Sequence, residues 1–224
     1  MHSSFDKDRY VSLVSRAAFN MEAWRGTYQD QSRNQLAMAA SGSPSFTMVN
    51  VLPALTQNAA GDGAWSAATA SIVDTTLPFW IEALIVPPPE NVYVFYQFSA
   101  GGWSCYFDSA NSRIFLMTYT AVGGDARFCS SPIGSLPVGR PSHVVIGVDP
   151  VGLSGRVHVG GVPAIATFVN TAPPVVCGPA TLDVCQPGGS FMRALIARAW
   201  QGTPSNEEAQ TLYQAASVLC GGEV

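Results

Sequence analysis

The residues best suited to chemistry here are the carboxylates, since hydrolysis of a glycosidic bond uses a pair of them about 5–5.5 Å apart in retaining enzymes. On a β-strand, two acids on one face stand two positions apart. None of the six glutamates has an acid two positions away. They are Glu22, Glu82, Glu90, Glu207, Glu208 and Glu223. Glycoside hydrolysis is therefore the least favoured function, and Glu82 is expected to be an outward-facing strand residue.

The sequence also shows no motif for a catalytic nucleophile or a metal site. The histidines are His2, His143 and His158, and there is no Gly-x-Ser-x-Gly or Cys/His signature. His143 and His158 are expected to lie on a predicted hairpin and to be satisfied by their neighbours, because zinc needs further ligands at a recognisable spacing. We predict a non-enzymatic protein with no catalytic residue, no metal and no cofactor.

Aromatic side chains offer a third kind of chemistry, stacking on sugar rings beside hydrogen-bonding groups. Trp65 and Trp103 are the candidates for exposure, since Gly61-Asp62-Gly63 and Gly101-Gly102 stand next to them. Tyr106 supplies a further ring and Asp62 a hydrogen-bonding group, and Tyr93, Tyr96 and Tyr119 could extend the set. The competing interpretation is that these rings fill the core, since each buries a large apolar area.

Composition limits the class of protein. Of 224 residues 47% are hydrophobic and 12% charged, with a net charge of −4, which favours a folded chain with a sizeable core. The negative charge attracts neither phosphate backbones nor anionic lipid, so nucleic acid and membranes are not expected partners. No apolar run reaches 18 residues, and the first eight residues lack a signal-peptide layout. We expect cytoplasmic synthesis and five free, mostly buried cysteines.

Short apolar runs separated by Gly and Pro predict an all-β fold. The predicted strands are residues 79–86, 92–98, 103–107, 113–120, 142–149, 156–160 and 191–200. Residues 11–22 fit a strand or an amphipathic helix. One short helix is predicted over about residues 204–219, because Ser205 and Glu208 fit a capping box. Residues 1–10 are predicted to be a tail or docking arm, and residues 11–224 a single domain.

Four segments occur in the order of a known family: Asp30-Gln31-Ser32-Arg33-Asn34, Phe79-Trp80-Ile81-Glu82-Ala83, the hairpin at 142–162, and Ala197-Arg198-Ala199-Trp200-Gln201-Gly202 with the following helix. Together they resemble the concanavalin A-like (LamG or pentraxin-type) jelly-roll superfamily. Arg33 stands where that family commonly has Gly, and Gly160 where it has Asp. The Glu-x-Asp-x-x-Glu string of its hydrolases is absent. The resemblance implies an antiparallel two-sheet jelly-roll sandwich.

The superfamily that the chain resembles includes lectins, hydrolases, adhesion modules and structural parts of phage virions. The fold alone therefore does not select a function. Low charge, and a single lysine (Lys7) among eleven basic residues, fit a surface used in contacts. A GC-rich genome that favours arginine codons explains the scarcity of lysine equally well. We therefore expect a structural or interaction protein located in a phage virion, such as a capsid decoration, head-fibre or tail protein. Its expected partners are further copies of itself and other virion proteins. The alternative is a lectin-like module that binds surface glycans.

Overall fold

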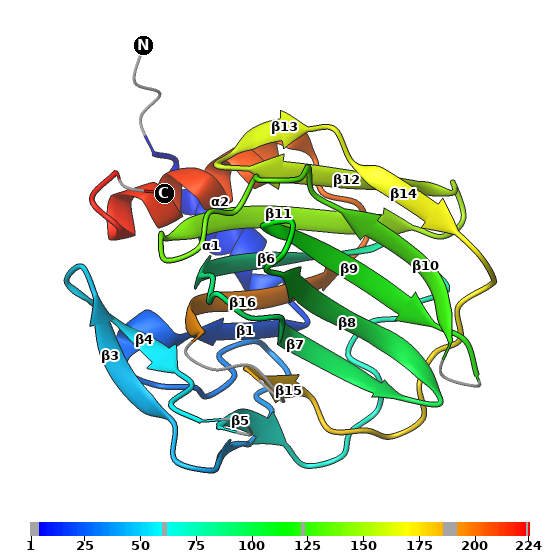
Figure 1. Cartoon of the computed structure of the whole chain (residues 1–224), viewed down its shortest axis with the longest axis horizontal. Helices are drawn as coiled ribbons and strands as arrows, with labels where there is room; N and C mark the ends of the chain where they lie inside the picture. The colour runs from blue at the N-terminus through cyan, green and yellow to red at the C-terminus, as the bar shows by residue number, and fades with distance from the viewer. Residues whose placement is uncertain (1–4, 60–61, 122–123, 186–191, 223) are drawn as a thin grey trace.

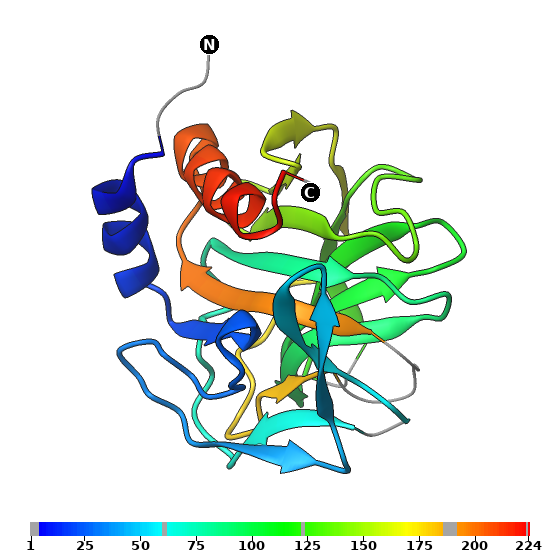
Figure 2. The ribbon, with the colours of Figure 1, turned by 90° about the vertical axis from the view of Figure 1, so that its left-hand side faces the viewer.

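The computed structural model describes all residues except 1–4, 60–61, 122–123, 186–191 and 223. Two antiparallel β-sheets pack face to face, and the described helices lie against the outer face of one of them (Figures 1 and 2). This confirms the predicted all-β antiparallel sandwich with a C-terminal helix. We call the sheet beneath the helices the covered sheet and its partner the open sheet.

The covered sheet has eight strands. In spatial order they are β13 (Val162–Ala164), β12 (Ser154–Val159), β11 (Ser142–Asp149), β6 (Phe79–Val86), β16 (Arg193–Gln201), β4 (Leu52–Thr56) and β3 (Ser45–Val49), and β1 (Phe19–Glu22) pairs with β16. The predicted hairpin of β11 and β12 is confirmed, with Val145 opposite His158. Pro87 and Pro88 follow β6, which ends the strand because proline cannot donate to a ladder.

The open sheet also has eight strands. In spatial order they are β14 (Thr167–Asn170), β10 (Asp125–Ser130), β9 (Arg113–Tyr119), β8 (Gly101–Asp108), β7 (Val92–Ser99), β15 (Asp183–Val184), β5 (Gly63–Ser66) and β2 (Met38–Ser41). The sequence predicted its centre, β7 to β9, within two residues at each boundary. It did not predict β2, β5, β10, β14 or β15, since segments of two to six residues carry little periodicity.

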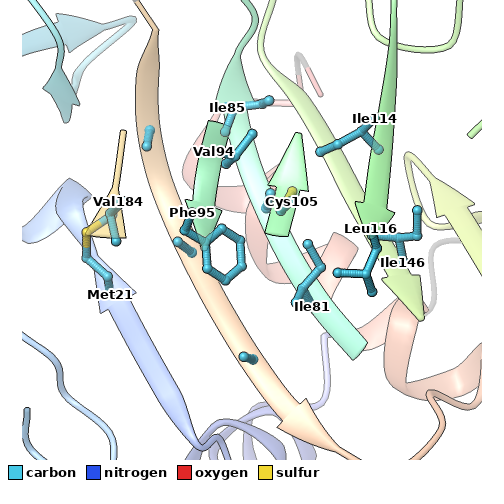
Figure 3. Close-up of a cluster of buried hydrophobic side chains, with 14 of the residues drawn as sticks. Met21, Ile81, Ile85, Val94, Phe95, Cys105, Ile114, Leu116, Ile146 and Val184 are labelled. Carbon is cyan, nitrogen blue, oxygen red and sulfur yellow. The ribbon is translucent and has the colours of Figure 1, made fainter. Parts of the chain in front are cut away.

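The core lies between the sheets and takes alternate residues from both. Figure 3 shows Ile81 and Ile85 of β6 beside Phe95 of β7, with Leu116 of β9 and Ile146 of β11 completing the cluster. The five cysteines are buried and free, as expected. Burial raises the pKa of the Cys129 thiol to about 12, so this side chain acts as a small apolar group.

Helix α2 (Asn206–Leu219) confirms the predicted C-terminal helix, including both hydrogen bonds of the Ser205–Glu208 capping box. It rests on the covered sheet, where the ring of Tyr213 lies against Gly161. Gly161 has a φ of +72°, and a Cβ there would stand 2.6 Å from that ring. Only glycine therefore permits this close packing of helix and turn.

Residues 11–22, which fitted helix or strand, are divided between the two: α1 (Lys7–Ser15) ends before β1 begins. A 3-10 helix, η1 (Ala23–Arg25), follows β1. A boundary between tail and domain at residue 10 thus falls inside α1. Arg9 of α1 is ion-paired with Glu207 of α2, so α1 packs as part of the helical layer.

A cluster of charged residues lies between the helices and the covered sheet. Arg198 donates to Glu82 Oε2 at 2.7 Å, to Glu22 Oε1 at 2.5 Å and to the Tyr10 hydroxyl at 2.8 Å. His143 Nε2 lies 2.9 Å from Glu82 Oε1. We call these five residues the buried charge cluster. The expectation that Glu82 faces solvent is wrong: it does point outward from the sheet, but α1 and α2 cover it and its exposure is 0%.

The buried charge cluster makes stability depend on acid pH. Burial alone would raise the pKa of Glu82, but Arg198 and His143 outweigh it and hold that pKa below its usual value; Arg198 and Arg25 do the same for Glu22. A lowered folded-state pKa contributes stability that is present above the unfolded value, about 4.3. The free energy of unfolding should therefore fall as pH drops below about 4.3.

Denaturant unfolding at pH 7, 5, 4 and 3 measures this dependence. Glu82→Gln should flatten the decline below about pH 4.3, because one of the two perturbed carboxyls is gone. The exposed Glu90 supplies the control, and Glu90→Gln should retain the wild-type profile. A decline of equal slope in both variants would contradict the assignment to Glu82.

Candidate functional site

The outer face of the open sheet carries a shallow groove of about 710 Å³. Figure 1 looks onto this sheet, and in Figure 2 the helices lie on the opposite side of the molecule. We call the hollow the aromatic groove. Its lining residues are Asn91, Tyr93, Tyr106, Asp108, Phe115, Met117, Tyr119 and Phe128.

Strand alternation explains why these rings share one face. In β8, Trp103, Cys105 and Phe107 are buried in the core, which leaves Tyr106 and Asp108 on the outer face. In β7 the register shifts between Tyr93 and Phe95, a bulge that inserts one residue. Tyr93 and Tyr96 therefore both lie on the outer face.

The rings of the aromatic groove brace one another. Tyr93 meets Tyr106 edge to face with centroids 5.2 Å apart, and Phe115 meets Phe128 in the same way at 5.6 Å. Tyr106 and Phe115 lie opposite each other on adjacent strands, with centroids 6.4 Å apart. Such tilted pairs are favourable and hold the rings in place, so a ligand meets a floor that is already ordered.

Polar side chains stand beside the rings of the groove, and Asp108 is part of its lining. Arg113 Nε lies 3.2 Å from Asp108 Oδ2, and Asn111 donates to the same oxygen at 2.8 Å. Burial raises the pKa of Asp108, but these two hydrogen bonds outweigh it, so the net pKa lies below the usual value and the group is ionised at neutral pH. The Arg113 guanidinium also covers the Phe115 ring at 4.5 Å. Hydrogen-bonding groups thus stand beside apolar ring faces.

The outer face continues beyond the groove toward β5. Asp183 of β15 lies opposite Tyr96 on one side and Trp65 on the other. Burial raises the pKa of Asp183, and hydrogen bonds from Thr181 and Tyr96 only partly offset this. Trp65 is 36% exposed and donates through Nε1 to Ala40 O at 3.3 Å. Trp65 and the groove therefore share one sheet face.

The structure places the four predicted site residues in different environments. Tyr106 lines the groove and Trp65 lies on the same face. The expectation that Trp103 is exposed is wrong: its exposure is 0%, and its ring packs in the core against Phe79 and Phe95. Asp62 is also buried and accepts backbone N–H bonds from its own loop and its neighbour, including Ser43 at 2.8 Å. Trp103 and Asp62 therefore stabilise the fold and do not line the groove.

Sequence reasoning missed Phe115, Phe128 and Asp108 as groove residues. The alternation of residues 113–120 was a usable signal, since Phe115, Met117 and Tyr119 occur at every second position. Nothing in the sequence showed which side of the strand would remain open. Phe128 lies on β10, a strand that was not predicted at all.

The two histidines that the structure describes do not form a site together. His143 and His158 lie on the outer face of the covered sheet under α2, and each contacts a different acceptor, Glu82 for His143 and the Asn206 side chain for His158. Among the described residues no group of three or more metal-ligating side chains is found. No helix in the described part of the chain is long and apolar enough to cross a membrane.

Comparisons with known proteins identify the fold. No family model matches the chain, and no curated protein matches it. Its backbone is similar to the botulinum neurotoxin serotype D binding domain (TM-score 0.72, 8% identity, 93% of this chain and 53% of that one). It is also similar to the binding domain of Paraclostridial Mosquitocidal Protein 1 (0.73, 12%, 91% and 53%).

A third similar structure is the serotype D ligand binding domain in complex with N-acetylneuraminic acid (TM-score 0.68, 9% identity, 92% of this chain and 52% of that one). The chain spans about half the length of each of these domains. At such low identity the similarity shows a shared fold.

Proposed function

We propose that this chain is a non-enzymatic binding module that holds a saccharide on the aromatic groove. The observation that carries the proposal is the floor of mutually packed rings, Tyr93, Tyr106 and Phe115, beside the ion pair of Asp108 and Arg113. A sugar presents apolar C–H faces and a rim of hydroxyls, which match ring faces and hydrogen-bonding groups respectively. A groove of about 710 Å³ is within the range of small-ligand sites.

The comparisons support this proposal without deciding it. The similar structures are named as binding domains of toxins, and one of them is a complex with N-acetylneuraminic acid. Hydrolysis is not proposed. Glu22 and Glu82, the two carboxylates of the buried charge cluster, are both bound to Arg198 beneath the helices.

Removing one ring tests the proposal. Tyr106→Ala should weaken saccharide binding by about 5- to 30-fold, since loss of a ring contact costs roughly 1–2 kcal/mol. Tyr106→Phe keeps the ring and should retain most of the affinity. The glycan is first found on a broad array with the intact chain, and affinities are then measured by calorimetry.

Phe46 supplies the matched control. This ring is 37% exposed on β3 of the covered sheet, stacked on Tyr28, away from the groove. Phe46→Ala should therefore bind the same glycan as wild type. Absence of binding to every glycan on the array, or equal affinity of Tyr106→Ala and wild type, would refute saccharide binding at this groove.

We also propose that the chain acts within a larger assembly as a homo-oligomer, with a place in a phage virion as the specific form. The supporting observation is a pair of exposed aliphatic side chains at one edge of the covered sheet, where Val162 begins the edge strand β13 and Ile165 directly follows it. Exposed edges of this kind favour contacts with other chains. Light scattering that gives a monomer mass of 23.6 kDa at all concentrations would count against self-assembly.

A further inference from the structure

A second hollow, of about 580 Å³, opens on the opposite side of the molecule from the aromatic groove. It is lined by residues from the end of α1, from the turn that carries Arg33 and Asn34, and from the loop between β16 and α2. We call it the arginine cleft, after Arg16 and Arg33 in its wall. Nothing in the proposed function uses it.

Two tryptophans make the base of the arginine cleft rigid. Trp80 of β6 and Trp200 of β16 are opposite in register, and their rings stack at 4.0 Å with planes 8° apart. The Trp200 indole donates to Leu13 O at 3.1 Å, which ties α1 to the sheet. The walls are thereby held at a defined separation.

Arg33 stands on a turn that is fixed in advance of any ligand. Asp30 accepts backbone hydrogen bonds from Asn20 at 3.0 Å, Ser32 at 2.8 Å and Leu36 at 3.0 Å. These bonds satisfy the Asp30 carboxylate within the turn. The Arg33 guanidinium has no ion-pair partner in the described part of the chain. The turn that Asp30 stabilises therefore holds the Arg33 guanidinium at the cleft.

The charge of the cleft favours a singly charged anion. Arg16 is paired with Glu208 at 2.9 Å, which leaves the charge of Arg33 uncompensated. A dianion such as phosphate would meet the Glu208 carboxylate as well as Arg33. A planar carboxylate matches the guanidinium fork with two parallel hydrogen bonds.

The size and remaining polar groups indicate what the carboxylate is attached to. The cleft is far larger than a bare ion requires. Asn34 uses its amide nitrogen to donate to Ala18 O at 2.7 Å, so its oxygen remains to accept. The exposed Thr203 also lines the cleft. These groups suit the hydroxyls of a polyol.

We propose that the arginine cleft is a binding site for a carboxylate-bearing sugar, with Arg33 as the group that binds the carboxylate. The site is independent of the aromatic groove, since the two hollows lie on outer faces of different sheets.

The test is an NMR and calorimetric titration of the intact chain with glucuronic acid at low salt, with glucose and inorganic phosphate titrated in parallel. Glucuronic acid should bind and shift the signals of residues 33–34 and 203, while glucose and phosphate should bind at least 10-fold more weakly. Arg33→Gln should weaken glucuronic acid binding by 10-fold or more, since a charge-assisted hydrogen bond is lost.

Arg140 provides the matched control, as an exposed arginine in the loop before β11 and outside the cleft. Arg140→Gln and Tyr106→Ala should both bind glucuronic acid like wild type, which separates this site from the aromatic groove. The proposal is overturned if glucuronic acid does not bind, if glucose or phosphate binds equally well, or if Arg33→Gln keeps wild-type affinity.

Discussion

Arg198→Met is expected to lower the free energy of unfolding by about 3–5 kcal/mol, the cost of leaving a buried charge without its partner. Arg198 and Glu82 are both fully buried, and the guanidinium binds the carboxylates of Glu22 and Glu82 at once. Without it Glu82 is left with His143 and Glu22 with Arg25, so each carboxylate either stays charged with less compensation or takes up a proton. Urea unfolding followed by circular dichroism measures the change.

Arg193 is the control on the same strand. It is half-buried at the start of β16, outside the buried charge cluster, so Arg193→Met should cost less than about 1 kcal/mol. A triple variant, Glu22→Gln with Glu82→Gln and Arg198→Met, removes both carboxylate charges together with the cation and should recover part of the loss. If Arg198→Met is as stable as Arg193→Met, or if the triple variant is the least stable of all, the electrostatic account fails.

Trp103→Ala is expected to destabilise the chain by about 3–5 kcal/mol, because it leaves a cavity between the sheets. The indole packs edge to face on Phe95 with centroids 5.2 Å apart and also contacts Phe79. The same unfolding measurement checks this value. In the fraction that stays folded, saccharide binding at the aromatic groove should be unchanged, since Trp103 points away from it.

Trp65 is the paired comparison, the same residue type on the outer face of the same sheet. Trp65→Ala should cost about 1 kcal/mol or less in stability. Equal losses for the two variants, or a specific loss of saccharide affinity in folded Trp103→Ala, would show that the burial of Trp103 does not govern its role.

Local sequence signals were sufficient for elements with a strong period or a cap. The run at 142–149 is apolar and β-branched and ends at Pro150, and β11 has those bounds. The Ser205 side chain accepts from the backbone N–H of Glu208, and the Glu208 side chain accepts from the backbone N–H of Ser205. Because both bonds lie within one turn, the start of the helix could be predicted from six residues. In both cases the determining interactions lie within a few residues of each other.

Period two also determined that Trp103 and Tyr106 lie on opposite faces of one strand. Which face was open could not be derived from that strand alone. The second sheet packs on the Trp103 side, and this depends on contacts with residues distant in sequence, such as Phe79. Of the two tryptophans that were candidates for exposure, Trp65 is therefore exposed and Trp103 is buried.

What the sequence by itself determined is the fold class, the strands with clear periods, the capped helix and the absence of an acid two positions from any glutamate. Only the tertiary structure decided that α1 and α2 bury Glu82, that a bulge in β7 brings Tyr93 and Tyr96 to one face, and that Arg33 and Thr203 line one cleft. The physical reason is the separation along the chain over which each interaction acts. Propensity, capping and alternation act over neighbouring residues, whereas burial and the meeting of side chains depend on which distant segments pack together.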